Sequence, residues 1–171
     1  FLKTKGKLSV SEESSEKLRV DIPRGFTLLA GSASKDPDMK DVTRYVKSRG
    51  LSTREMWFFR MGTCLTGRFR RRVIIPSFDS DGILNYYAAR SIDPTDKMKY
   101  INARVPKTEV IFNEMNINWK EELVLVEGPF DLTKCTDNST CLLGSHLSHD
   151  SVLFKNIVKN KTPIILALDP D

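Results

Sequence analysis

Glu127, Asp169 and Asp171 are three carboxylates whose type and position suit the binding of a magnesium ion. Glu127 directly follows the apolar run 123–126, and the two aspartates follow the apolar run 164–168. Magnesium takes oxygen ligands, commonly one or two carboxylates, and fills its other positions with water and substrate phosphates. Two such ions stabilise the attacking and leaving oxygens of a phosphoryl transfer. The carboxylates therefore predict metal-assisted phosphate chemistry, with a solvated acidic loop as the alternative.

The elements that would position these carboxylates are three buried strands, expected at 123–126, 140–143 and 164–168. The first and the last are continuous apolar runs, as in strands covered on both faces of a sheet. Pro129 suits the first turn of a helix, and Ser148 is a candidate cap for a second helix. This alternation predicts a parallel sheet with right-handed crossovers. Because ligands gather beyond the carboxyl ends of such strands, the three carboxylates should converge.

The first half of the chain has the signals of an α+β unit. Apolar residues at helical spacing over 39–46 predict a helix that stops at Gly50. Ser52 and the glutamate three residues later form a capping box for a second, short helix. β-branched residues on both sides of an Asp-Ser-Asp-Gly turn predict a hairpin over 71–92, and a further short strand is expected at 110–112.

The fold class expected is therefore α/β, an α+β lobe followed by a Rossmann-like parallel sheet. We expect residues 39–118 to form the first lobe, with a basic surface, and residues 119–171 to form the parallel sheet. Residues 1–38 are expected to be an N-terminal segment or linker, because the stretch 9–17 is rich in serine and glutamate. The chain begins with Phe and ends at an aspartate, so we expect a piece of a longer polypeptide whose sheet is incomplete at its C-terminus.

The net charge of +5 is unevenly distributed. Basic residues gather at 68–72 and 97–107, whereas acidic residues gather at 121–131 and at the end of the chain. This pattern suits a protein that holds a polyanion beside a metal ion. No apolar run approaches the roughly 20 residues of a membrane helix, and no signal peptide is visible. Three cysteines are too few for a disulfide framework, so we expect a cytoplasmic setting.

A zinc site is a competing interpretation for Cys135, Cys141, His146 and His149. Their spacing departs from the close cysteine pairs of structural zinc sites, and Cys141 falls within an expected buried strand. Buried thiols and loop histidines explain these residues more simply. We therefore expect no zinc site within this chain.

Three stretches together resemble the TOPRIM domain, which bacterial-type primases, topoisomerases and some nucleases share. They are Val-Leu-Val-Glu-Gly-Pro-Phe-Asp at 124–131, Leu-Gly-Ser at 143–145 and Ala-Leu-Asp-Pro-Asp at 167–171. The upstream half is similar to the RNA-polymerase domain of bacterial-type DNA primases. That similarity is carried, in order, by Tyr45–Ser52, Arg70–Pro76, Asp81–Gly82, Ala89–Arg90, Lys99–Asn102 and Ile111–Asn113.

The resemblance implies a DNA primase, a DNA-directed RNA polymerase that makes short RNA primers on single-stranded DNA by magnesium-dependent nucleotidyl transfer during replication. Glu127, Asp169 and Asp171 would be the catalytic and metal-binding residues, with Mn²⁺ as an alternative to Mg²⁺. The residues implied to bind nucleotide or template are Arg90, Lys99 and Asn102. Those implied to bind DNA are Arg68, Arg70, Arg71 and Arg72, with a solvated charged strand as the alternative. Asp131 would support the metal ligands without touching the ion, or interact with a helix N-terminus.

The partners implied are single-stranded DNA, ribonucleoside triphosphates and a replicative helicase, in the cytoplasmic replisome of a bacterium or of a phage in its host. The sequence departs from the family in lacking the cysteine pairs of the primase zinc ribbon, which puts the choice of initiation sequence in doubt. The alternatives are the primase half of a primase–helicase, a TOPRIM nuclease or topoisomerase, and a nucleic-acid-binding module without catalysis.

Overall fold

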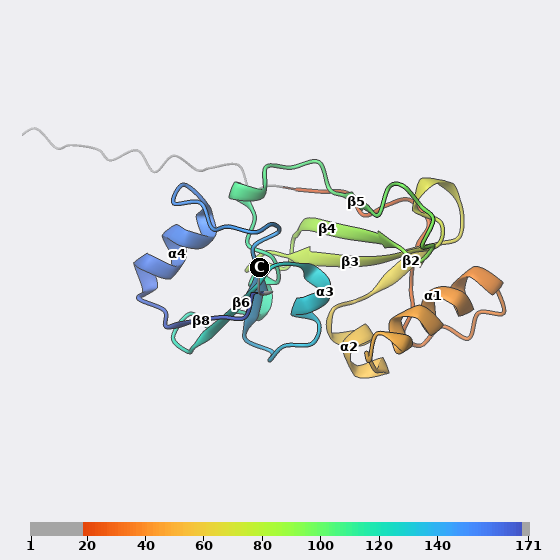
Figure 1. Ribbon diagram of the computed structural model, residues 1–171, viewed down its shortest axis with the longest axis horizontal. Coiled ribbons are helices and arrows are strands. Elements are labelled where there is room, and N and C mark those ends of the chain that lie inside the picture. Colours follow the sequence, from red (N-terminus) through yellow and green to blue (C-terminus); the bar gives the residue numbers. More distant parts are fainter. Residues whose placement is uncertain (1–18, 169–171) are drawn as a thin grey trace, which may run out of the picture.

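The computed structural model describes residues 19–168, so Asp169 and Asp171 lie outside the described residues, as does the segment 1–18. Two sheets lie side by side (Figure 1), a five-stranded sheet of order β1-β2-β3-β4-β5 and a three-stranded sheet of order β7-β6-β8. All pairs in the first sheet are antiparallel, and both pairs in the second are parallel. The expected α/β fold class is therefore confirmed.

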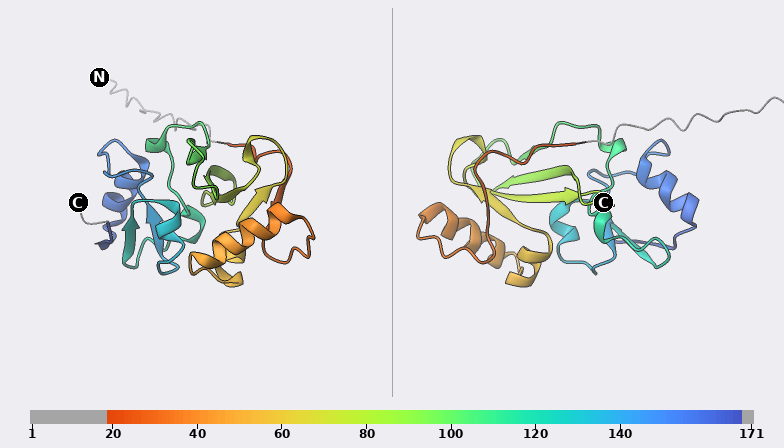
Figure 2. Two further views of the ribbon diagram at one scale, coloured as in Figure 1. Left: turned by 45° about the vertical axis from the view of Figure 1, so that its right-hand side comes forward. Right: turned by 180° about the vertical axis from the view of Figure 1, so that it is seen from behind.

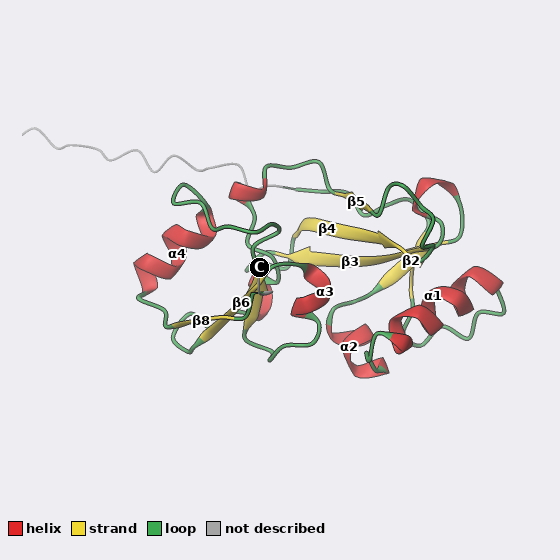
Figure 3. Cartoon of the chain, in the orientation of Figure 1, coloured by secondary structure: helices red, strands yellow, loops and turns green. Residues whose placement is uncertain are grey.

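Two helices precede the long strands of the first sheet. Helix α1 (Pro37–Ser48) is capped by Asp36, whose carboxylate accepts hydrogen bonds from the amides of Asp38 and Met39, and it buries its apolar face. The chain then turns at Gly50, where φ is +84°, a conformation that glycine adopts without strain. Helix α2 (Thr53–Phe58) begins with the expected capping box. The Ser52 hydroxyl accepts a hydrogen bond from the amide of Arg54, and the Glu55 carboxylate accepts one from the amide of Ser52. Both helices flank one end of the first sheet (Figure 3).

The first sheet is built around the predicted hairpin. Its strands are β1 (Phe26–Leu28), β2 (Gly62–Cys64), β3 (Arg72–Phe78), β4 (Leu84–Ser91) and β5 (Tyr100–Asn102). Strands β3 and β4 pair from Arg72 opposite Ser91 to Phe78 opposite Leu84. Asp79 fixes the turn, because its Oδ1 accepts hydrogen bonds from the amides of Asp81 and Ile83, each at 2.9 Å.

The second sheet carries the alternating strands and helices. Its elements are β6 (Leu123–Val126), α3 (Pro129–Leu132), β7 (Ser139–Cys141), α4 (Val152–Asn160) and β8 (Ile164–Leu166). Short 3₁₀ helices at Gly67–Phe69, Lys107–Glu109 and Glu114–Asn116 lie in the connections. Helix α4 lies at the far end of the molecule from α1 and α2 (Figure 2). None of the helices within residues 19–168 is long and apolar enough to cross a membrane.

Three expected local features were wrong. The third parallel strand, β8, was expected to be buried, but its side chains are exposed, because β8 is an edge strand paired only with β6 among the described residues. Residues 110–112 form a buried loop instead of a strand, and side chains bind its carbonyls: Asn85 donates to Ile111 and Thr140 donates to Phe112. The cap of α4 is Ser151, whose Oγ accepts a hydrogen bond from the amide of Phe154 at 3.1 Å. Ser148 lies one turn earlier and binds Ser151 through its carbonyl.

The two sheets share one hydrophobic core. Buried residues of the first sheet, such as Val73 and Ala89, belong to the same cluster as Val126 and Phe130 of the second. A smaller cluster beneath α4 includes Leu123 and Leu125. This continuous burial fixes the basic first half of the chain against the strand that leads to Glu127.

Asp38 of α1 forms ion pairs with Arg70 and Arg71, the two arginines that directly precede β3. Hydrogen bonds from Arg70 and then Arg71 lower the pKa of its carboxyl below the ordinary value of 3.8, against the opposing effect of burial. Because the pKa is lower in the folded state than in the unfolded chain, the pair stabilises the fold above about pH 3.8 and loses this contribution as the pH falls further. We expect thermal unfolding to show a smaller loss of stability on acidification for Asp38→Asn than for the wild type; equal acid sensitivity would contradict this role.

Candidate active site

Glu127 lies at the carboxyl end of β6, the central strand of the parallel sheet. The strands beside it run in the same direction: Leu142 donates its amide to Val126, and Ala167 donates its amide to Leu125, both at 2.9 Å. The carboxyl ends of β6, β7 and β8 therefore meet at one edge, as the sequence predicted. The Glu127 side chain is half-buried there.

The turn after Glu127 brings Asp131 back towards the backbone. Gly128 caps α3, and a Cβ built on this glycine would lie 3.2 Å from Oδ2 of Asp131. Asp131 itself is exposed in the first turn of α3. This position is compatible with both roles expected for it, so the choice between them stays a prediction.

The donor chemistry of this edge fits magnesium. Glu127 offers carboxylate oxygens, and the described chain after β8 ends at Leu168, directly before Asp169 in the sequence. Within residues 19–168, no group of three or more His, Cys, Asp or Glu side chains lies close enough to hold a metal ion. The expected ligand set needs Asp169 and Asp171, which are outside these residues, and so it stays a prediction.

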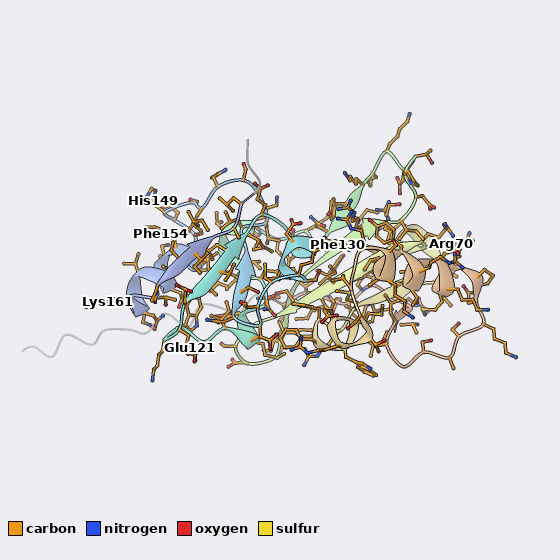
Figure 4. All side chains as sticks on the ribbon, turned by 60° about the horizontal axis from the view of Figure 1, so that its bottom comes forward. Arg70, Glu121, Phe130, His149, Phe154 and Lys161 are labelled. Atoms are coloured by element: carbon orange, nitrogen blue, oxygen red, sulfur yellow. The ribbon has the colours of Figure 1, made fainter. Side chains whose placement is uncertain are left out.

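The residues considered for zinc do not form a group that could hold a metal ion among residues 19–168, although Cys141 and His146 line the same cavity. Cys141 is buried in β7, where burial raises the pKa of its thiol well above the usual range. The Cys135 thiol lies in the turn after α3, 3.4 Å from the carbonyl of Asp131. The His149 ring packs edge-on against Phe154, with centroids 4.9 Å apart (Figure 4).

The arginines at 70–72 are engaged within the protein. Arg71 reaches three carboxylates, Asp38 and Asp41 at 3.0 Å and Asp93 at 2.8 Å. The hydrogen bonds that Arg71 donates to these carboxylates, those to Asp93 above all, raise its pKa well above the ordinary value.

Arg72 is only 4% exposed. It binds the carboxylate of Asp96 and donates to the carbonyl of Met98 at 2.8 Å. Arg71 and Arg72 therefore hold the connection between β4 and β5. Their expected contact with template phosphates stays a prediction.

The two other expected DNA-binding arginines have more accessible side chains. Arg70 pairs with Asp38, but 57% of its side chain is exposed (Figure 4). Arg68 is exposed, lies 4.8 Å from the centroid of the Phe69 ring and forms no ion pair with any residue in the described part of the chain. The expected contact with DNA phosphates therefore stays a prediction for Arg68 and, less directly, for Arg70.

The residues expected to bind nucleotide or template lie on β4 and β5. Arg90 faces Tyr100 across these strands, and its Nη1 donates to the Tyr100 hydroxyl at 2.7 Å. Lys99 is exposed, while its carbonyl accepts the amide of Ser91 at 3.0 Å. The Oδ1 atom of Asn102 is buried and has no hydrogen-bond partner of normal geometry among residues 19–168.

Sequence reasoning missed the aromatic residues around Arg90. The guanidinium lies 5.2 Å from the centroid of the Phe130 ring, and Phe130 comes three residues after Glu127. Burial lowers the pKa of Arg90, but interactions with Tyr100 and Tyr45 outweigh it and keep the pKa above its ordinary value. Since Arg90 and Tyr100 are opposite one another, the register of β4 and β5 would have identified this part of the site.

No family model matches the chain. A curated DNA primase of Mycoplasma genitalium is 29% identical over 145 residues, which cover 80% of this chain and 24% of that protein. The DNA primase of Mycoplasma pneumoniae is 32% identical over 113 residues, covering 60% of this chain and 18% of that protein. The chain thus spans about a quarter or less of the length of these curated relatives.

Solved structures of primase catalytic cores share the fold. The Escherichia coli primase catalytic core matches with a TM-score of 0.65 and 20% identity, over 80% of this chain and 57% of the other. The DnaG primase catalytic domain bound to single-stranded DNA matches with a TM-score of 0.63 and 19% identity, over 77% and 56%. In sequence this chain is similar to these DNA primases, and it has the fold of the DnaG primase catalytic core.

Proposed function

We propose that this protein is a DNA primase, which joins ribonucleotides into short RNA primers on a single-stranded DNA template. The observation that carries the proposal is the position of Glu127. It lies at the carboxyl end of the central parallel strand, at the junction with a sheet that carries Arg90, in the fold of a primase catalytic core. The relatives named DNA primase support the same activity.

The roles proposed for the chain follow from this placement. Glu127, Asp169 and Asp171 of a TOPRIM domain over 119–171 would hold Mg²⁺, or Mn²⁺ in its place. When bound, the ion would neutralise charge on the nucleotide phosphates and stabilise the attacking and leaving oxygens. Glu127 acts as a ligand or, as the second option, as the base that takes the proton of the primer hydroxyl. The lobe 39–118 supplies the template surface.

The remaining residues bind the substrates. Arg90 and Lys99 neutralise phosphate charge, and Asn102 hydrogen-bonds to template or nucleotide. The proposed partners are single-stranded DNA, ribonucleoside triphosphates and a replicative helicase, in a cytoplasmic replisome. A solved DnaG catalytic domain of this fold is bound to single-stranded DNA, which supports the first of these partners.

The exposed cations Arg68 and Lys99 give a test of the template surface. Arg68→Gln combined with Lys99→Gln should weaken binding of a single-stranded oligonucleotide and reduce the salt dependence of its affinity. A protein with fewer phosphate contacts releases fewer counterions when it binds. Fluorescence anisotropy at several salt concentrations measures both quantities. Lys159→Gln, on the exposed face of α4, is the matched control and should change neither. Equal behaviour of the double variant and the control would remove these residues from the template surface.

A synthesis assay tests the activity itself. Full-length protein would be incubated with single-stranded DNA, labelled ribonucleotides and Mg²⁺, and the products separated by size. Oligoribonucleotides that appear only when template is present support a primase. Cleavage of the DNA without synthesis would instead assign the acidic site to a nuclease or topoisomerase, and binding without either reaction would indicate a non-catalytic module.

A further inference from the structure

Arg90 is held by aromatic side chains instead of carboxylates. Its guanidinium carbon lies 5.2 Å from the ring centroid of Phe130 and 5.3 Å from that of Tyr100. Nη1 of Arg90 also donates a hydrogen bond to the Tyr100 hydroxyl. Tyr45 packs edge-on against Phe130, with centroids 6.3 Å apart. We call Tyr45, Tyr100 and Phe130 the aromatic clamp.

The aromatic clamp joins parts of the molecule that are far apart in the sequence. Tyr45 belongs to α1, Tyr100 to β5 opposite Arg90, and Phe130 to α3. Phe130 is only 2% exposed and lies where the two sheets meet (Figure 4). Because Phe130 follows Glu127 by three residues, the clamp fixes the guanidinium of Arg90 next to the turn that leaves the acidic edge.

Whether carboxylates or aromatic rings surround an arginine determines how much of its positive charge remains available to a ligand. Arg71, by comparison, is surrounded by three carboxylates, which neutralise its charge. No described carboxylate forms an ion pair with Arg90, whereas the face of an aromatic ring attracts a cation without cancelling its charge. A guanidinium that is fixed in place and still charged is suited to charge-assisted, bidentate hydrogen bonding to a phosphate group.

We propose that Tyr45, Tyr100 and Phe130 are positioning residues that hold Arg90 uncompensated at the junction of the two sheets, where it binds a phosphate group beside Glu127. The inference rests on the proposed function for the source of that phosphate, which is either the incoming ribonucleotide or the template strand. The contacts that hold the guanidinium are independent of that source.

A double-mutant cycle tests the coupling between Arg90 and the aromatic clamp. Equilibrium binding would be measured for wild type, Arg90→Gln, Phe130→Leu and the double variant, with two probes: a labelled single-stranded oligonucleotide and a fluorescent ribonucleoside triphosphate with Mg²⁺. We expect Arg90→Gln to weaken binding of one probe by about tenfold and Phe130→Leu to weaken the same probe by about threefold. The double variant should bind no more weakly than Arg90→Gln alone, because the ring acts through the guanidinium. The affected probe identifies the source of the phosphate.

Phe112→Leu is the matched control, because Phe112 is 1% exposed and packs edge-on against Tyr86, whereas the guanidinium of Arg90 lies over the rings of Tyr100 and Phe130. It should lower stability about as much as Phe130→Leu and leave binding of both probes unchanged. Additive effects of Arg90→Gln and Phe130→Leu, or unchanged binding of both probes by Arg90→Gln, would overturn the inference. If the cycle shows the expected coupling but the wild-type protein makes no primers, the proposed function is overturned while the role of the aromatic clamp stands.

Discussion

Replacing Glu127 by glutamine is expected to reduce primer synthesis at least about a hundredfold, because a ligating carboxylate contributes several kcal/mol of charge stabilisation in the transition state. The change preserves the size of a half-buried side chain at the end of β6. Thermal stability should therefore stay close to that of the wild type. Initial rates of ribonucleotide incorporation on single-stranded DNA, measured at saturating Mg²⁺, give the result.

Glu121→Gln is the control for this variant. Glu121 is exposed and precedes the amino end of the same strand (Figure 4), so the substitution removes an equal charge at the end of β6 opposite to Glu127. It should leave synthesis unchanged. A rate for Glu127→Gln that matches the rate for Glu121→Gln would show that Glu127 takes no part in the reaction.

Arg72→Met should lower the stability of the fold, although the sequence suggested a role in DNA binding for Arg72. The methionine keeps the apolar stem but loses the hydrogen bonds to the carbonyls of Arg68 and Met98, at 3.2 and 2.8 Å. Hydrogen bonds of this kind contribute about 1 kcal/mol each. The two together predict a fall in the melting temperature of about 5 °C. Differential scanning calorimetry measures it directly.

Arg68→Met is the comparison, since this arginine is exposed and should leave the melting temperature unchanged while weakening DNA binding. Arg72→Met should instead lower the melting temperature and leave the DNA affinity unchanged. A stable Arg72→Met protein with lost DNA affinity would restore the role that the sequence suggested for Arg72.

The correct predictions rested on signals that are local in the sequence. The capping box at Ser52 and the hairpin turn at Asp79 each involve residues within four positions, so their geometry follows from spacing alone. The parallel strands at 123–126 and 164–166 follow from apolar runs too short for helices, alternating with helical segments. Their order also places the end of β8 beside the end of β6.

The errors arose where long-range contacts decide the structure. The ion pairs of Arg71 with Asp93 and of Arg72 with Asp96 were not predicted, because the partners lie more than twenty residues apart in the sequence. Residues 110–112 have strand-forming side chains, yet the carbonyls of Ile111 and Phe112 are bound by side chains of Asn85 and Thr140. Propensity cannot reveal such tertiary partners. The aromatic residues around Arg90 were missed for the same reason.

We propose that primer synthesis depends on a metal ion bound through Glu127, Asp169 and Asp171. The most direct measurement is the rate of primer synthesis by full-length wild-type and Asp169→Asn proteins across a Mg²⁺ titration. We predict a rate that rises to saturation with Mg²⁺ for the wild type and stays near background for Asp169→Asn at every concentration. Equal rates for the two proteins, or synthesis that persists in excess chelator, would contradict the account.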